Sequence, residues 1–121
     1  MPGTKIMENE GVSGGGEAAI RGAALRRLKG MGQLLKPVVH IGKDGLSDGL
    51  VASVNQALVD HELIKVKFDG HKDEKKTLAP DLAQRTRSQM IQRVGNVVVL
   101  FRRNPELAQR KIELPESEAA E

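Results

Sequence analysis

Cysteine and the large aromatic residues are absent or scarce in this chain. It has no Cys, Trp or Tyr, and its two Phe residues are Phe68 and Phe101. Without Cys there can be no disulfides, thiol catalysis or cysteine zinc sites, and three His residues offer little for a metal centre. The lack of rings also excludes a sheet platform that stacks bases as RRM and cold-shock domains do. We therefore expect no metal and no cofactor, and any bound nucleic acid to be held mainly by its backbone.

Long apolar runs are missing too. No segment approaches the roughly 18 apolar residues of a membrane span, and the N-terminal residues lack the basic start and apolar run of a secretory signal. We therefore expect a soluble, cytoplasmic protein without a membrane partner. A length of 121 residues corresponds to one domain.

Charge is distributed unevenly along the chain. Residues 18–115 hold 18 of the 19 Lys and Arg but only 10 of the 16 Asp and Glu, a net charge of +8, whereas the whole chain carries +3. A basic core of this kind favours a polyanionic partner, although plain solubility is an alternative explanation. We interpret residues 1–17 as a flexible Gly-rich tail, 18–115 as a single domain and 116–121 as an acidic C-terminal tail.

Hydrophobic periodicity predicts the elements of this domain. Gly30 and Gly32 should end the first helix, Ser47 should cap the second, and Pro80 should start the regular part of the third. The expected helices are 18–29, 47–61 and one within 71–87, and the expected strands are 38–41, 63–68, 90–94 and 97–102.

The order α-β-α-β-α-β-β predicts an α+β fold, a two-layer sandwich in which a four-stranded mixed sheet carries its helices on one face. Strands 38–41 and 63–68 should be parallel. Strict alternation within 63–68 places Lys65 and Lys67 on the face away from the helices.

A Gly-Lys-Asp-Gly segment, residues 42–45, joins the first strand to the second helix. Two glycines with two residues between them let a sugar-phosphate chain approach the backbone, and the adjoining helix start adds free N–H groups and partial positive charge. KH domains use a GXXG loop in this way. By itself, however, such a pair of glycines is more often an ordinary turn.

Longer runs of sequence add to this motif. Between Leu28 and Pro115 the chain closely resembles the CRM family, the chloroplast RNA splicing and ribosome maturation domain, in its short bacterial YhbY-type form. The runs that carry the resemblance are LKG at Leu28–Gly30, LKPVVHIGKDGLSDG at Leu35–Gly49, QALVDHELIKVK at Gln56–Lys67, KTL at Lys76–Leu78, GNVVVLFR at Gly95–Arg102 and RKIELP at Arg110–Pro115.

The resemblance implies an RNA-binding module with a fold similar to the C-terminal domain of translation initiation factor three. It implies association with ribosomal RNA or precursor large ribosomal subunits as an assembly factor, and a monomeric state is expected. The RNA-binding residues it implies are the GXXG loop, Gly42, Lys43, Asp44 and Gly45, and a basic surface of Arg26, Arg27, Lys29, Lys36, Lys65 and Lys67.

An enzyme, a protein–protein adaptor and a splicing cofactor are the alternatives to RNA binding in ribosome assembly. An enzyme would need a poised nucleophile, base or metal cluster, and no such set is evident, so we expect no catalysis. A protein–protein adaptor would bind through an apolar patch with weak salt dependence. An RNA-binding splicing cofactor is the remaining alternative, because plant relatives use such domains in intron splicing.

Overall fold

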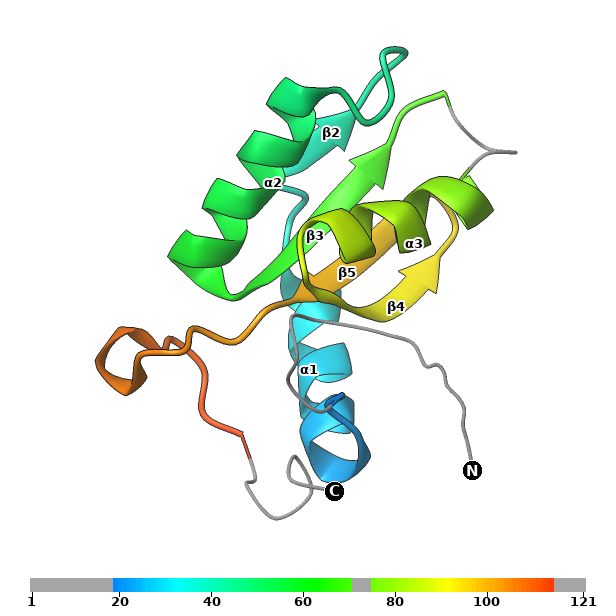
Figure 1. The fold of residues 1–121 in the computed structure, drawn as a ribbon. Coiled ribbons are helices and arrows are strands. Elements are labelled where there is room, and N and C mark those ends of the chain that lie inside the picture. Colours follow the sequence, from blue (N-terminus) through cyan, green and yellow to red (C-terminus); the bar gives the residue numbers. More distant parts are fainter. Residues whose placement is uncertain (1–18, 71–74, 115–121) are drawn as a thin grey trace, which may run out of the picture.

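The computed structural model describes residues 19–70 and 75–114 (Figure 1). The predicted tails, residues 1–17 and 116–121, lie outside the described residues, as does part of the segment before the third helix. The helices and strands are α1 (Gly22–Leu34), β2 (Val39–Ile41), α2 (Asp48–His61), β3 (Leu63–Phe68), α3 (Lys75–Arg85), β4 (Gln89–Val94), β5 (Val97–Phe101) and a short 3-10 helix, η1 (Leu107–Gln109).

The four strands form one mixed sheet in the order β2-β3-β5-β4. β2 and β3 run parallel, with Val39 opposite Val66, and the remaining pairs are antiparallel. The α+β class, the order of elements and the parallel pair are therefore confirmed.

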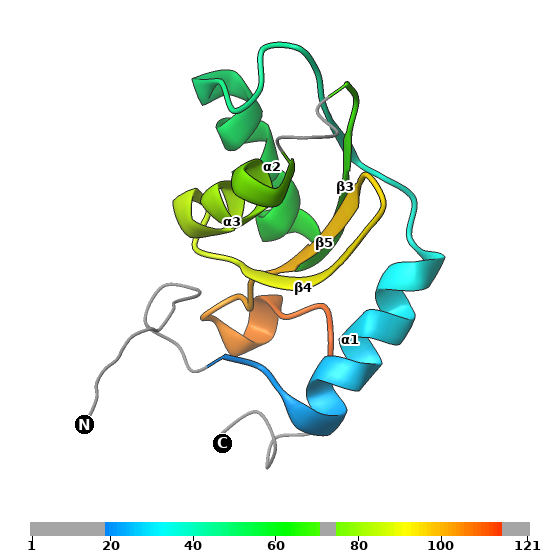
Figure 2. The same ribbon diagram turned by 90° about the vertical axis from the view of Figure 1, so that its right-hand side faces the viewer.

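Helices cover both faces of the sheet, and this corrects one detail of the predicted sandwich. α2 and α3 pack on one face, whereas α1 crosses the other (Figure 2). The reason lies in β5, whose sequence VVVLF is apolar at every position and so presents buried side chains to both sides. Val98 and Leu100 belong to the core under α2 and α3, while Val99 and Phe101 pack beneath α1 with Ile112.

α1 runs through the two glycines that were expected to end it, so that boundary prediction was wrong. Gly32 is buried, and a Cβ atom placed on it would lie 3.0 Å from Cγ1 of Val99. The missing side chain lets the helix approach β5 closely, and tertiary packing thus outweighs the low helix propensity of glycine.

α3 also departs from expectation, because Pro80 lies inside the helix and not at its start. A proline at such a position costs about 3 kcal/mol through a lost hydrogen bond and a steric clash. Pro80 is exposed, while Ala79, Leu82 and Ala83 are buried against the sheet. Burial of these neighbours holds the helix in place.

Candidate nucleic-acid interface

The GXXG segment forms an exposed turn directly after β2. The N–H of Gly45 donates to the carbonyl oxygen of Gly42 at 3.0 Å, and Gly45 has a φ of +64°. Lys43 and Asp44 occupy the exposed tip between them. The turn therefore presents one cationic and one anionic side chain to solvent.

The start of α2 adjoins this turn. The Oγ atom of Ser47 accepts a hydrogen bond from the N–H of Leu50 at 3.2 Å, which confirms the predicted N-cap, and Asp48 lies in the first turn. A Cβ atom on Gly49 would meet no atom within 4 Å. Open space beside a helix N-terminus allows an anionic group to approach the backbone.

Lys65 and Lys67 lie on the opposite side of β3 from the buried Ile64, Val66 and Phe68, which confirms the predicted alternation. That side was expected to be free of helices, and this part of the prediction was wrong, because α1 packs on it. Both lysines are half-buried.

The position beside Lys67 in β2 is held by His40, an exposed residue. The Nδ1 atom of His40 lies 3.1 Å from Oδ2 of Asp69. Since Gly42 follows β2 by one residue, Lys67 lies along the sheet between Lys65 and the GXXG turn.

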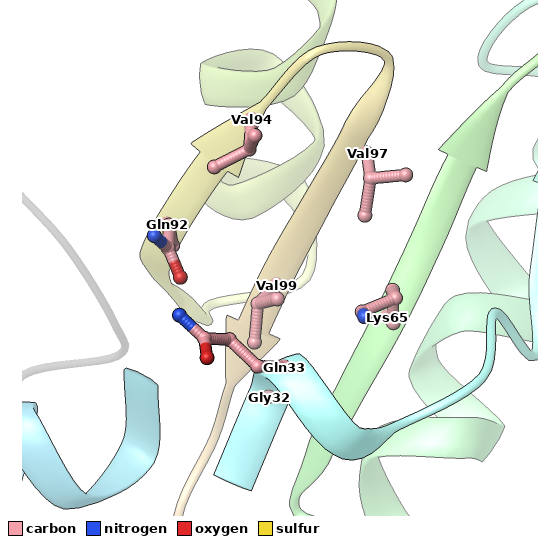
Figure 3. A pocket seen from close by; sticks show the side chains of 7 residues that line it. All are labelled: Gly32, Gln33, Lys65, Gln92, Val94, Val97 and Val99. Atoms are coloured by element: carbon pink, nitrogen blue, oxygen red, sulfur yellow. The ribbon is translucent and has the colours of Figure 1, made fainter. Parts of the chain in front are cut away.

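A hollow opens where α1 leaves the sheet uncovered (Figure 3). It has a volume of about 290 Å³ and lies beside the C-terminal end of α1. The residues that line it are Gly32, Gln33, Lys65, Gln92, Val94, Val97 and Val99. Lys65 is thus one wall of a cavity as well as part of a basic surface.

The cations of α1 fall into two groups. Arg26 and Lys29 are exposed and precede Gln33 by seven and four residues, so these three side chains share one side of the helix. Arg27 projects from another side, and its Nε–H donates to the carbonyl oxygen of Glu113 at 3.0 Å. The structure therefore places Arg26 and Lys29 on the side that carries Gln33 and gives Arg27 a contact with the C-terminal segment.

Lys36 is exposed in the segment between α1 and β2. The ten predicted residues consequently do not form one compact site. The GXXG turn lies at the C-terminal end of β2, whereas Arg26 and Lys29 of α1 lie beyond the N-terminal end of β2 (Figure 1). Lys65 and Lys67 lie between these two groups.

Three polar residues that lie at the hollow or in the interior were not predicted from the sequence. Gln33 and Gln92 line the hollow, but a single glutamine on a helix or strand gives no periodic signal. Glu62 is fully buried, and a charged residue between a helix and an apolar strand was a usable sign of an internal hydrogen-bond acceptor.

Arg102 connects three segments, and the sequence predicted no such role for it. Its guanidinium donates to Oδ1 of Asn55 at 2.9 Å and to the carbonyl oxygen of Thr86 at 2.7 Å. Burial, and then the nearby charge of Arg87, lower the pKa of Arg102 below its usual value. These bonds give the side chain a structural role at the end of β5.

Within residues 19–70 and 75–114, no three His, Asp or Glu side chains lie close enough to hold a metal ion. None of the helices in this part of the chain is long and apolar enough to cross a bilayer.

The fold and the turn together define a class of protein. KH domains hold a nucleic-acid backbone with a GXXG loop, and here a GXXG turn adjoins a four-stranded sheet in which Lys65 and Lys67 are half-buried. Residues 20–102 match the family described as the CRS1 / YhbY (CRM) domain. The chain belongs to this family.

The chain is similar to named proteins and to a solved structure. The chain is 37% identical over 81 residues to a protein of Pseudomonas aeruginosa named as a probable RNA-binding protein, covering 66% of this chain and 78% of the relative. It is 40% identical over 89 residues to an RNA-binding protein of Haemophilus influenzae, covering 73% and 87%. A solution structure of a Staphylococcus aureus protein, described as a candidate RNA-binding protein, matches with a TM-score of 0.67 and 33% identity, covering 80% of this chain and 100% of that one.

Proposed function

We propose that the chain is a non-enzymatic, monomeric RNA-binding protein that acts in the cytoplasm as an assembly factor on ribosomal RNA or precursor large ribosomal subunits. The GXXG turn, together with Lys65 and Lys67 of β3 on the sheet face that carries α1, binds the RNA backbone. Family membership and the names of the relatives support RNA as the partner.

One structural observation carries the role of the turn. Gly42 lies outside the positive-φ region, and a Cβ atom on it would meet no atom within 4 Å. Neither backbone conformation nor packing within the described residues therefore requires glycine at this position. Close approach of a partner's sugar-phosphate chain to the backbone does require it.

Electrostatics supports the same conclusion. Lys43 stands at the tip of the turn, and the partial positive charge of the α2 N-terminus lies behind it. Lys65 and Lys67 continue the positive surface along β3. Phosphates are attracted to such an array, and the attraction is sequence-independent.

The test is an electrophoretic shift assay with precursor ribosomal RNA, together with co-sedimentation with precursor large subunits. The parent should bind both, and Gly42→Ala should fold normally but bind more weakly. Gly45→Ala is the contrasting variant, because its φ of +64° makes any side chain there costly to folding. A Gly42→Ala protein that binds as well as the parent would remove the turn from the interface, and a parent that binds neither RNA nor particles would refute the function.

A further inference from the structure

The hollow beside α1 has a mixed lining, of which the proposed binding of the RNA backbone uses only Lys65. Its floor is formed by Val97 and Val99 of β5, and its walls carry Lys65 and two amide side chains, Gln33 from α1 and Gln92 from β4. Figure 3 shows the amide ends of the two glutamines pointing toward one another at one side of the hollow. We infer that this hollow binds a single unpaired RNA base; the inference rests on the proposed function.

The hydrogen-bonding groups fit such a ligand. Each glutamine amide offers an N–H₂ donor and a carbonyl acceptor, and the edge of a nucleobase presents donors and acceptors side by side. Within residues 19–70 and 75–114, the backbones of Gln33 and Gln92 belong to α1 and to the β4–β5 pair, whereas their side-chain amides make no hydrogen bond. Both amides are therefore available to a base edge.

The apolar floor fits the face of a base. Val99 is 4% exposed because Gly32 packs on it, whereas Val97 is half-buried and Val94 is 62% exposed. A flat base laid over Val94 and Val97 would cover apolar surface that is now open to water. With no Trp or Tyr in the chain, aliphatic contact takes the place of aromatic stacking here.

The size of the hollow and the charge of its lining restrict the kind of ligand further. A volume of about 290 Å³ lies just below the usual range for ligand pockets, roughly 300 to 1,000 Å³, and has room for one base. No acidic residue is among those that line the hollow. Lys65 at its wall and Lys67 two residues further along β3 can meet the phosphates that flank the bound nucleotide.

The base must be unpaired and unstacked, because a base within an A-form helix has its faces covered by its neighbours and its Watson–Crick edge already paired, whereas the bases of loops, bulges and ends can be splayed out. The sheet face would thus select a loop, bulge or single-stranded end. The GXXG turn at the far end of β2 would hold the backbone of the same RNA. Backbone contact and base contact are then made by separate parts of one surface.

The first experiment removes the amides without changing charge. The double variant Gln33→Ala/Gln92→Ala and the parent are titrated with a single-stranded RNA of mixed sequence and with an abasic strand of the same length. The parent should prefer the RNA, and the double variant should bind RNA roughly tenfold more weakly, as expected for loss of one good base contact. Because no charge is removed, the slope of affinity against salt should stay unchanged.

A matched control is Gln84→Ala, an exposed glutamine on α3, on the opposite face of the sheet. It should bind both strands as the parent does. If the parent binds neither strand, the proposed function itself fails. If the parent binds RNA and the double variant binds it equally well, RNA binding stands and the base site is refuted.

A second measurement uses the parent alone, so it does not depend on how the variants fold. The side-chain amide signals of Gln33 and Gln92 and the methyl signals of Val97 are followed by NMR during addition of each strand. All should shift with RNA and much less with the abasic strand. Equal shifts with both strands would show that the hollow binds phosphate and not a base. The absence of shifts with RNA would show that the hollow does not bind RNA and would favour a protein partner. Either result overturns the inference.

Discussion

The carboxylate of Glu62 accepts a hydrogen bond from the backbone N–H of Lys111 at 2.7 Å, across 49 residues of sequence. The same carboxylate also accepts from the N–H groups of Asn104 at 2.6 Å and Ile112 at 3.0 Å. Glu62 itself has a φ of +65° at the end of α2. One buried side chain therefore holds the segment after β5 against the domain.

Replacing Glu62 with Ala should destabilise the domain by about 2 to 4 kcal/mol, because three backbone N–H groups lose a charged acceptor. Chemical denaturation measures the free energy of unfolding. Glu106→Ala, an exposed acid on the same C-terminal segment, should change it by less than about 0.5 kcal/mol. Equal stability of the two variants would show that the segment is held by its apolar contacts alone.

The two glycines inside α1 should respond in opposite directions. Gly30 is exposed with no atom within 4 Å of a Cβ position, so Gly30→Ala should stabilise the protein by about 0.5 to 1 kcal/mol through helix propensity. Gly32→Leu would force the helix away from Val99 and should cost about 1 to 3 kcal/mol. Thermal or denaturant unfolding distinguishes them, and a Gly32→Leu protein as stable as the parent would contradict the close packing.

Reversing the charge at the tip of the GXXG turn should separate binding from folding. Lys43→Asp removes an exposed side chain near the start of a helix, where an acid is tolerated, so the free energy of unfolding should change by less than about 1 kcal/mol. RNA affinity should fall by about 1 to 3 kcal/mol, since attraction to a phosphate becomes repulsion. Lys76→Asp, an exposed lysine of α3, is the control. Unchanged RNA binding by folded Lys43→Asp would mean that the segment is only a turn.

The lysines of β3 offer a complementary test on the sheet face. Lys65→Ala/Lys67→Ala should leave the melting temperature nearly unchanged, because half-exposed lysines on a sheet contribute little, within about 0.5 kcal/mol each. Affinity for RNA should decrease, with a smaller salt dependence. Calorimetry and a binding titration measure the two quantities. A large drop in melting temperature would show that the lysine stems are needed for packing beside α1.

Salt should weaken RNA binding steeply. If roughly three to six phosphates are neutralised, the plot of log K against log salt should have a slope of about −2 to −4 for single strands. Fluorescence titrations at several salt concentrations give this slope. Tight binding with a flat response would exclude an electrostatic interface and favour an adaptor that binds through apolar contacts.

Local signals in the sequence were sufficient for most of the fold. Ser47 precedes a clear amphipathic stripe, and the structure confirms it as the N-cap of α2. Alternation in β3 correctly separated Lys65 and Lys67 from the buried Ile64, Val66 and Phe68, although α1 packs on the side of the lysines. In these cases one short segment contains both the signal and the structure that it predicts.

Predictions failed where distant segments decide the outcome. Gly32 stays helical because Val99 of β5 lies against it, and Pro80 stays helical because its neighbours are buried. The site shows the same limit: the loop residues could be named from the motif, but Gln33 and Gln92 come together only through the crossing of α1 over the hairpin. Contacts of this kind have no local sequence signature.

Ile20 near the start of the described chain and Leu114 at its end pack in the same hydrophobic cluster. Gln89 fixes the first of these positions by pairing with both backbone groups of Ile20, at 2.7 and 2.8 Å. Both positions lie beside α1, while the GXXG turn lies at the other end of the molecule (Figure 1). A protein tethered to a surface beside Ile20 or Leu114 would therefore present this turn to the solution.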